Sequence, residues 1–575
     1  MITTCVLIFL ENAFFLLSAW SFKELINVVP GMVSRQVHSI QSLLPGLLRC
    51  MAGALCYTVV RSLSAYFIEL QGATVNEYLD DKIHEKANQL NLSFYESPEY
   101  FDTLKRAKDA GSDKSVNIVI TFIEAIKHII MLGTLSLLVM AIAWELIPLL
   151  IACILPAFLV RMTLARRLHK RKIMQTPVER QAAYLSSLLV DDKSAKEIRT
   201  FNLGMYLKEK YLRIRLMLLA ERAGITRTGT FYSIITDILA TFVFFICVLF
   251  ICYKVINSAI KPGEITPFLL IFPQVFMVLQ QLSTSLVKLY HDHIFLGCLF
   301  KLFDLKSTLP EASHPVPIPS TDKQAITVSG LHFTYPHSSV AALTDINLTF
   351  PSGKIIAIVG FNGAGKTTLI KMLCRLYDPG EGTIALGGTD IREYSITEYR
   401  RQVATVFQDF GRYNFSVAEN ICMGDVNVAP QSAAMHNAAV AAGADRFIAA
   451  FPRQYETVLG RLFEDGQEIS MGQWQKIAIA RVLYGPAKFI ILDEATSALD
   501  AKSEKIFFES LKDNIGTRGA LIISHRLSAV QHADYIYVLA DGRITQEGTH
   551  DALIATGGDY ANLFSKNAKH SSVTI

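Results

Sequence analysis

Long apolar segments dominate the first half of the chain. They recur near residues 3–25, 43–70, 118–143, 146–166, 231–256 and 264–288. A helix needs about 20 apolar residues to cross the hydrocarbon core of a bilayer. The pattern therefore predicts six membrane-spanning helices. The first segment has no cleavage site, so we interpret it as a retained span rather than a signal peptide.

The connections between these segments differ in charge. Lys and Arg collect between residues 161 and 227, whereas the turns near 29–42 and 257–263 hold almost none. Because cytosolic connections carry the excess of basic residues, the two long connections are expected to face the cytosol. Helical patterning in them is interrupted at Pro98 and Gly204, so short helices that contact another domain are expected there.

The pattern changes after the sixth apolar segment. Residues 305–323 carry four prolines, a composition typical of an extended, semi-rigid linker. From Ala325 onward, short apolar strands alternate with helices, as in an α/β domain. We therefore predict an all-α transmembrane domain of six helices over 1–304, a linker over 305–324 and an α/β domain over 325–575.

Composition agrees with a membrane protein and excludes several other classes. The 575 residues are 51% hydrophobic and 18% charged, too apolar for an ordinary soluble or disordered chain. A net charge of +4 gives no global basic field, so we expect no nucleic-acid partner. The nine cysteines form no CxxC pair, which argues against a zinc site and against a disulfide framework.

A glycine-rich segment carries the first catalytic signal. Residues 360–368, GFNGAGKTT, follow an apolar strand and begin a helical run, which is the context that a P-loop requires. In a P-loop the backbone N–H groups and the helix N-terminus surround the phosphates. We expect Lys366 to reach the β and γ phosphates of ATP and the Thr367 hydroxyl to coordinate Mg²⁺. The C-terminal domain is therefore predicted to be an α/β P-loop nucleotide-binding domain.

A second apolar strand ends in two acids. Residues 488–492 lead into Asp493 and Glu494, as in a Walker B element. We expect Asp493 to hold Mg²⁺ through water and Glu494 to act as general base on the attacking water.

The order of the remaining motifs resembles that of ATP-binding cassette proteins. Between the P-loop and the acids lies EISMGQWQK (468–476), similar to the family's signature; SALD (497–500) and ISHR (523–526) follow. Six predicted spans fused ahead of one cassette resemble a half-transporter of the ABC exporter type. The resemblance covers nearly the whole chain, including residues 94–101 and 195–208, which resemble the family's two coupling helices.

The resemblance implies a role for each matching residue. Tyr335 is implied to stack on adenine, Gln408 to contact Mg²⁺ and the attacking water, and His525 to contact the γ-phosphate. The implied nucleotide-binding set is Tyr335, Gly360, Asn362, Gly363, Gly365, Lys366, Thr367, Thr368, Ser470, Gly472, Gln473 and Asp500. Catalysis is assigned to Glu494, His525 and Gln408, and metal binding to Thr367, Gln408 and Asp493.

In such exporters the signature acts on the ATP held by a second cassette, so the chain is expected to work as a dimer. Met471 departs from the family because it replaces the first glycine of the signature. A homodimer is favoured because closed two-fold self-association is the commonest oligomer. The alternative is a heterodimer in which a related half-transporter carries the complementary motifs.

Polar residues inside the apolar segments are candidates for a substrate cavity. They are Glu11, Asn12, Gln274, Gln280 and Gln281. For Asp237 and for the pair Glu124 and Lys127, a place in the cytosolic extensions of the helices is at least as well supported.

The expected function is ATP-driven export of an amphipathic peptide, drug or lipid out of the cytosol by alternating access. The pair Trp474 and Gln475 resembles exporters of ribosomally made peptides. The expected place is the bacterial inner membrane, in contact with lipid, with the cassette in the cytoplasm. A multidrug or lipid exporter, a regulatory membrane ATPase and an importer stay open as alternatives, as does a start upstream of Met1.

Overall fold

The computed structural model describes most of the chain, in two compact units. The described residues are 2–34, 43–97, 114–142, 145–256, 265–307, 309–319, 321, 324–336, 338–497, 501–514, 516–524 and 526–563. The helical unit comprises 1–89 and 98–305, and the cassette unit comprises 90–97 and 306–575. The short segment Leu90–Ser97 therefore belongs to the cassette unit, although the chain on both sides of it belongs to the helical unit.

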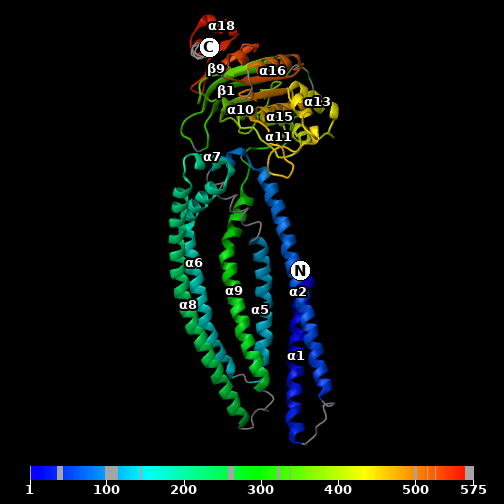
Figure 1. The fold of residues 1–575 in the computed structure, drawn as a ribbon, viewed down its shortest axis with the longest axis vertical. Coiled ribbons are helices and arrows are strands. Elements are labelled where there is room, and N and C mark those ends of the chain that lie inside the picture. The colour runs from blue at the N-terminus through cyan, green and yellow to red at the C-terminus, as the bar shows by residue number, and fades with distance from the viewer. Residues whose placement is uncertain are drawn as a thin grey trace. The chain divides into compact units, whose positions relative to one another are not determined.

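Long helices make up the helical unit (Figure 1). They are α1 (Ile2–Ser34), α2 (Leu44–Gln89), α5 (Lys114–Ile142), α6 (Leu146–Val190), α8 (Gly204–Ile256) and α9 (Ile265–Asp304). Each predicted apolar segment coincides with one of them, which confirms the predicted helical domain. Among the described residues, four stretches are long and apolar enough to cross a membrane: Thr3–Phe22, Leu44–Gln89, Val116–Leu137 and Gly204–Lys254.

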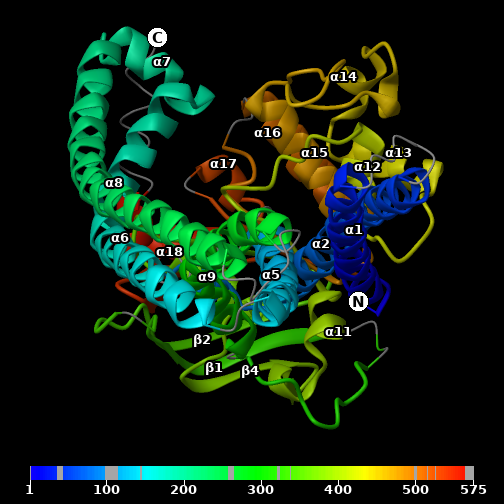
Figure 2. The same ribbon diagram turned by 90° about the horizontal axis from the view of Figure 1, so that it is seen from below.

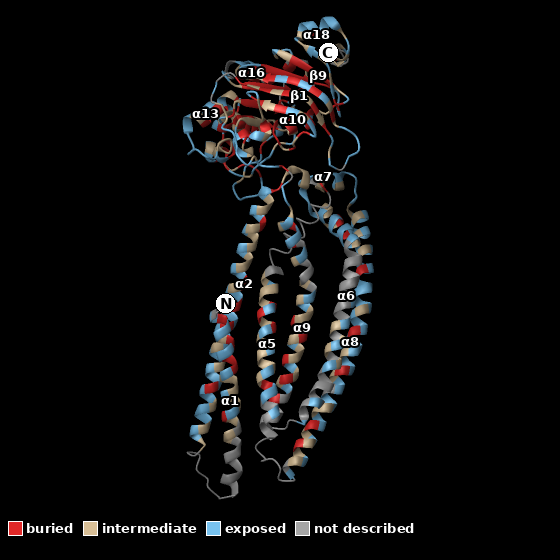
Figure 3. Cartoon of the chain, turned by 180° about the vertical axis from the view of Figure 1, so that it is seen from behind, coloured by how far each residue is buried: buried red, intermediate tan, exposed pale blue. Residues whose placement is uncertain are grey.

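The long helices pack in pairs. The most extensive contacts join α1 with α2, α6 with α8, and α5 with α9, which Figures 1 and 2 show side by side. Glycine permits close approach between α2 and α5, because a Cβ at Gly72 would lie 2.8 Å from a methyl carbon of Val116. Much of the remaining helix surface is exposed, as Figure 3 shows in pale blue, and it includes large apolar side chains suited to lipid.

Two short helices lie in the segments where the sequence predicts them. They are α3 (Leu92–Tyr95) in the first long connection and α7 (Asp192–Thr200) in the second. Residues 98–101 of the first predicted coupling segment lie outside the described residues.

The cassette unit is built on two sheets. A six-stranded sheet has the order β10-β9-β3-β8-β7-β6, in which only β10 runs antiparallel to its neighbour. Its strands are β3 (Ile355–Val359), β6 (Val403–Val406), β7 (Phe489–Asp493), β8 (Gly519–Ile523), β9 (Tyr535–Ala540) and β10 (Arg543–Gly548). The antiparallel sheet comprises β1 (Ala325–Phe333), β2 (Leu343–Pro351), β4 (Glu381–Leu386) and β5 (Thr389–Asp390).

Helices cover the parallel sheet on both faces. Strands β3, β7 and β8 are fully buried, which explains their almost continuous apolar sequences. One core surrounds α10 (Lys366–Leu373) between the two sheets, and another surrounds α15 (Met471–Tyr484) and α16 (Ala501–Asn514). Figure 3 shows this burial in red. The predicted α/β nucleotide-binding domain is confirmed.

The remaining helices of the cassette are short. They are α11 (Ile396–Arg400), α12 (Val417–Cys422), α13 (Ser432–Ala441), α14 (Asp445–Ala449), α17 (Leu527–Val530) and α18 (His550–Thr556).

The proline-rich segment after α9 is extended, and it is also attached to the cassette. The guanidinium of Arg375, which is fully buried, donates to the carbonyls of Pro310 and Tyr394 at 3.1 and 2.9 Å. It also pairs with the Asp378 carboxylate at 3.3 Å. A single buried cation therefore fixes the start of the linker to the cassette.

We expect Arg375→Met to destabilise the cassette. Loss of the guanidinium leaves the Asp378 carboxylate and two carbonyls without their donor, a defect worth about 3 kcal/mol. The midpoint of thermal unfolding of the purified chain should fall by several degrees. Arg401→Met is the matched control, because that side chain is 43% exposed and pairs only loosely with Glu398. Equal shifts in both variants would contradict the role given to Arg375.

Candidate functional site

The P-loop has the strand–loop–helix geometry that its sequence predicts. Strand β3 ends at Val359, and α10 begins at Lys366. Gly363 and Gly365 have φ values of +84° and +101°, in the left-handed region that favours glycine. A Cβ at Gly365 would also lie 2.8 Å from the carbonyl oxygen of Ala342. The loop therefore leads directly to a helix N-terminus, where an anion is favoured.

The side chain of Lys366 lies beneath this loop. Its ammonium donates to the carbonyls of Gly360 and Phe361 at 2.8 and 2.9 Å, and the residue is 8% exposed. Burial lowers the pKa of Lys366 below its ordinary value, against the opposing charges of Glu494 and Asp493. The only charge on the loop is thus held close to the two acids that follow β7.

The two acids meet the P-loop helix at the carboxyl edge of the sheet. The Thr367 hydroxyl donates to the Asp493 carboxylate at 3.4 Å, although 126 positions separate the two residues. Burial raises the pKa of Asp493 to about 6, and the charge of Glu494 adds to the rise. The Gln408 amide donates to the Glu494 carboxylate at 2.9 Å. Sequence-predicted residues from three separate segments therefore form one cluster.

The donor set of this cluster fits magnesium. Mg²⁺ prefers oxygen ligands, and the cluster offers the Thr367 hydroxyl, the Asp493 carboxylate and the amide oxygen of Gln408. Two adjacent carboxylates also repel one another, and a divalent cation relieves that repulsion.

Glu494 is held in an unusual backbone conformation. Its φ is +49°, which is rare for a residue other than glycine and is typical of functional sites. Its N–H donates to the Ile523 carbonyl at 3.0 Å, and its carbonyl accepts from the Gln475 amide at 3.2 Å. Gln475 lies on α15 and is 2% exposed. The sequence pattern does not predict this contact, because Gln475 stands out only as part of a variant of the signature.

The signature segment forms the start of α15. Ser470 is the N-cap, and its hydroxyl and backbone N–H exchange hydrogen bonds with Gln473 in a capping box. Gly472 follows within the first turn. Met471 is 52% exposed, so its side chain faces outward from this helix start.

Tyr335 lies beside the P-loop helix. Its hydroxyl hydrogen-bonds to the Thr368 hydroxyl at 3.1 Å. Its ring packs edge-on against Phe333 and Tyr377, with centroids 5.0 and 5.5 Å away. The structure thus brings Tyr335 to the helix that begins with Lys366. Asn362, by contrast, is exposed on the loop.

His525 and Asp500 lie outside the described residues. A buried acid that the sequence pattern does not single out, Glu504, lies on α16. Glu504, 1% exposed, accepts from the Thr496 hydroxyl at 2.7 Å and pairs with Arg526 at 3.4 Å. Arg526 also donates to the Ser497 carbonyl at 2.9 Å. Glu504 therefore connects the residues that precede Asp500 with the residue that follows His525.

Two polar residues of the helical unit form an ion pair. Glu11 of α1, 3% exposed, pairs with Lys127 of α5 at 2.8 Å. Lys127 lies in the middle of the apolar stretch Val116–Leu137, which argues against a cytosolic extension as its place. The Asn12 amide donates to the Ile8 carbonyl within its own helix.

The other predicted cavity residues lie on α9. Gln274 and Gln280 are partly buried, whereas Gln281 is exposed.

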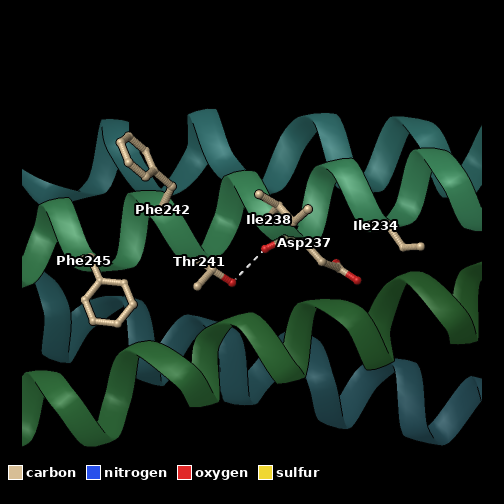
Figure 4. Close-up of a pocket in the computed structure, with 6 residues that line it drawn as sticks. All are labelled: Ile234, Asp237, Ile238, Thr241, Phe242 and Phe245. Carbon is tan, nitrogen blue, oxygen red and sulfur yellow. Dashed lines mark hydrogen bonds between the residues drawn. The ribbon is translucent and has the colours of Figure 1, made fainter.

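An open groove of about 450 Å³ follows one face of α8. It is lined by Ile234, Asp237, Ile238, Thr241, Phe242 and Phe245 (Figure 4). The Thr241 hydroxyl donates to the backbone carbonyl of Asp237 at 2.9 Å. The four apolar side chains are each more than half exposed, so this is a shallow apolar surface. The predicted cavity residues are not among the residues that line it.

Comparisons with known proteins show which family the chain resembles. A family model described as ABC transporter matches residues 343–497. The subtilin transport ATP-binding protein SpaT of Bacillus subtilis is 31% identical over 486 residues, which cover 83% of this chain and 78% of SpaT. The nisin transport ATP-binding protein NisT of Lactococcus lactis subsp. lactis is 26% identical over 513 residues, which cover 88% of this chain and 84% of NisT.

A lipid transporter and a solved structure are also similar. An ATP-dependent lipid A-core flippase of Methylococcus capsulatus is 36% identical over 319 residues, which cover 55% of this chain and 52% of the flippase. The solved structure of a bacterial Atm1-family ABC exporter with ATP bound has a TM-score of 0.80 and 22% identity. The structural similarity covers 99% of this chain and 98% of the exporter chain, and it supports the described fold.

We expect the pair of Glu11 and Lys127 to be necessary for stable packing of α1 on α5. Glu11→Gln leaves the Lys127 cation without its partner, and the midpoint of thermal unfolding should fall by about 5 °C. The double variant Glu11→Gln/Lys127→Met should recover most of this loss, because neither member of the ion pair is left charged without the other. Glu24→Gln is the control, since its partner Arg49 is 65% exposed. A Glu11→Gln effect no larger than that of Glu24→Gln would contradict the prediction.

Proposed function

We propose, because the chain belongs to the ATP-binding cassette (ABC) transporter family, that it is an ATP-driven exporter of an amphipathic peptide and works as a dimer. The observation that carries the proposal is the convergence of Lys366, Asp493 and Gln408 at one edge of the cassette sheet, in a chain whose other unit consists of long apolar helices.

ATP binding and hydrolysis follow from the residues at that edge. The P-loop and Lys366 would bind the phosphates, and Thr367, Asp493 and Gln408 would hold Mg²⁺. When bound there, Mg²⁺ would neutralise the negative charge that develops on the phosphates during hydrolysis. Glu494 would take the proton of the attacking water, with its carboxylate oriented by Gln408. Roles for His525 at the γ-phosphate and for Asp500 are proposed from the family alone.

The dimer completes each ATP site. Ser470, Gly472 and Gln473 of one subunit would contact the ATP bound to the P-loop of the other. The exposed side chain of Met471 is flexible and can move away from a phosphate, so two copies of this chain are compatible with two sandwiched ATP molecules. We favour the homodimer over a heterodimer because two-fold self-association is the commonest assembly.

Transport would follow from the difference in affinity for ATP between two conformations. Closure of the two cassettes on ATP would favour an outward-open arrangement of the helices, and hydrolysis would reset it. The segments around α3 and α7 are the proposed couplers, as in the family.

The cargo is proposed from the relatives and from the polar residues of the helical unit. SpaT and NisT are transport proteins for subtilin and nisin, and their similarity extends over more than three quarters of this chain. The proposed cavity residues are Glu11, Asn12, Gln274, Gln280 and Gln281. The proposed place is the bacterial inner membrane, with the cassette in the cytoplasm. Lipid flipping is the second candidate, since the flippase similarity covers about half of the chain.

The test is flux through proteoliposomes that contain this chain alone. With ATP outside, a fluorescent nisin-like peptide should accumulate inside, whereas a fluorescent lipid should not change leaflet. Glu494→Gln is the control: it should keep ATP binding and reduce turnover by a factor of at least about 100, because general-base catalysis is lost. ATP-dependent lipid movement without peptide uptake would favour the second candidate. Inactivity restored only by a second half-transporter would overturn the homodimer.

A further inference from the structure

The segment Leu90–Ser97 is attached to the cassette next to the P-loop helix. Leu92 of α3 packs against the apolar core that surrounds α10. The Asn91 amide oxygen accepts from the Ser307 hydroxyl at 3.0 Å. The segment therefore has its own contacts within the cassette unit. Glu96 directly follows α3 and lies close to the P-loop helix α10.

The carboxylate of Glu96 binds two side chains of the cassette. It accepts from the Lys371 ammonium at 2.6 Å and from the Tyr377 hydroxyl. Lys371 lies on α10, one turn after the Thr367 and Thr368 pair. Burial alone would lower the pKa of Lys371, but Glu96 and the nearby Tyr335 raise it overall, which keeps the ammonium charged. Hydrogen bonds between charged groups are stronger than neutral ones.

Both partners of Glu96 contact Tyr335. The Lys371 ammonium lies 5.5 Å from the centroid of the Tyr335 ring, a distance at which cations are attracted to aromatic faces. The Tyr377 ring packs against the same ring at 85°, with centroids 5.5 Å apart. Together with the hydrogen bond to Thr368, these contacts fix the position of Tyr335.

We propose that Glu96 is a positioning residue for the nucleotide base. Its carboxylate holds Lys371 and Tyr377 in the arrangement that presents the Tyr335 ring to adenine. The segment Leu90–Ser97 thereby sets the affinity for ATP through the base and not through the phosphates. The role of Glu96 rests on the proposed nucleotide site, and Glu96 is the residue that links that site to the segment Leu90–Ser97. By linkage, ATP binding strengthens the attachment of the segment by the same factor.

The experiment measures binding of two Mg²⁺-bound probes, ATP and inorganic triphosphate, to the full chain in a Glu494→Gln background. Glu96→Gln removes the charge that holds Lys371 and keeps an oxygen for Tyr377. The Kd of ATP should rise by about 3- to 10-fold, the size expected for one cation–aromatic or hydrogen-bond contact. The Kd of triphosphate, which has no base, should change by less than about twofold. Lys371→Met should give the same base-selective loss.

Two controls separate positioning from damage to the fold. Glu398→Gln removes an exposed acid that pairs with Arg401, so it should change neither Kd. In a Tyr335→Ala background, Glu96→Gln should have no further effect on ATP, because the ring through which it acts is gone.

Three outcomes would overturn the proposal. They are an unchanged Kd of ATP in Glu96→Gln, an equal loss for ATP and triphosphate, and an undiminished loss in the Tyr335→Ala background. Because the assay measures binding only, absence of peptide transport would count against the export function and leave this proposal standing. Absence of ATP binding by the chain with Glu96 intact would contradict the nucleotide site itself.

Discussion

The parallel alignment of β3, β8 and β7 is the constraint on which the candidate ATP site depends. Ile523 of β8 aligns with Ile358 of β3 on one side and with Asp493 of β7 on the other. The P-loop and the acids therefore emerge at the same edge of the sheet, and Thr367 reaches Asp493. Because side chains alternate between faces, a shift of one residue in either pairing would turn Asp493 away from the loop.

Much of this site could be predicted from sequence because its parts are encoded locally. A buried parallel strand, a glycine-rich loop and a helix start are each encoded by a contiguous run of residues. In this order along the chain they predict a P-loop. Contacts between distant polar side chains could not be predicted in this way. Glu96 and Lys371 are 275 positions apart in the sequence. Glu504 cannot be distinguished by its sequence context from an ordinary surface acid of an amphipathic helix. A pattern indicates that a residue is buried, but it does not identify the partner that compensates its charge.

In the helical unit, too, the elements can be predicted from sequence but the contacts between them cannot. Length and hydropathy suffice to predict its long helices, because a bilayer requires about 20 apolar residues. They do not predict which helices pair, since surfaces that face lipid are as apolar as surfaces that face protein. The ion pair of Glu11 and Lys127 is a contact of this kind, and it joins α1 to α5 within stretches that are mainly apolar. Membership of the ABC transporter family restricts the possible functions further than these patterns do.

If the sheet edge after β3 binds ATP through its loop lysine, loss of that lysine must weaken ATP binding. The most direct measurement is the Kd of Mg²⁺-bound ATP for the full chain and for Lys366→Ala. Lys354→Ala serves as control, because that lysine precedes the other end of β3 and is 57% exposed. Lys366→Ala is expected to raise the Kd by at least about tenfold, the loss expected for a hydrogen bond to a charged group, while Lys354→Ala leaves it unchanged. Equal affinity in all three proteins would contradict this role of Lys366.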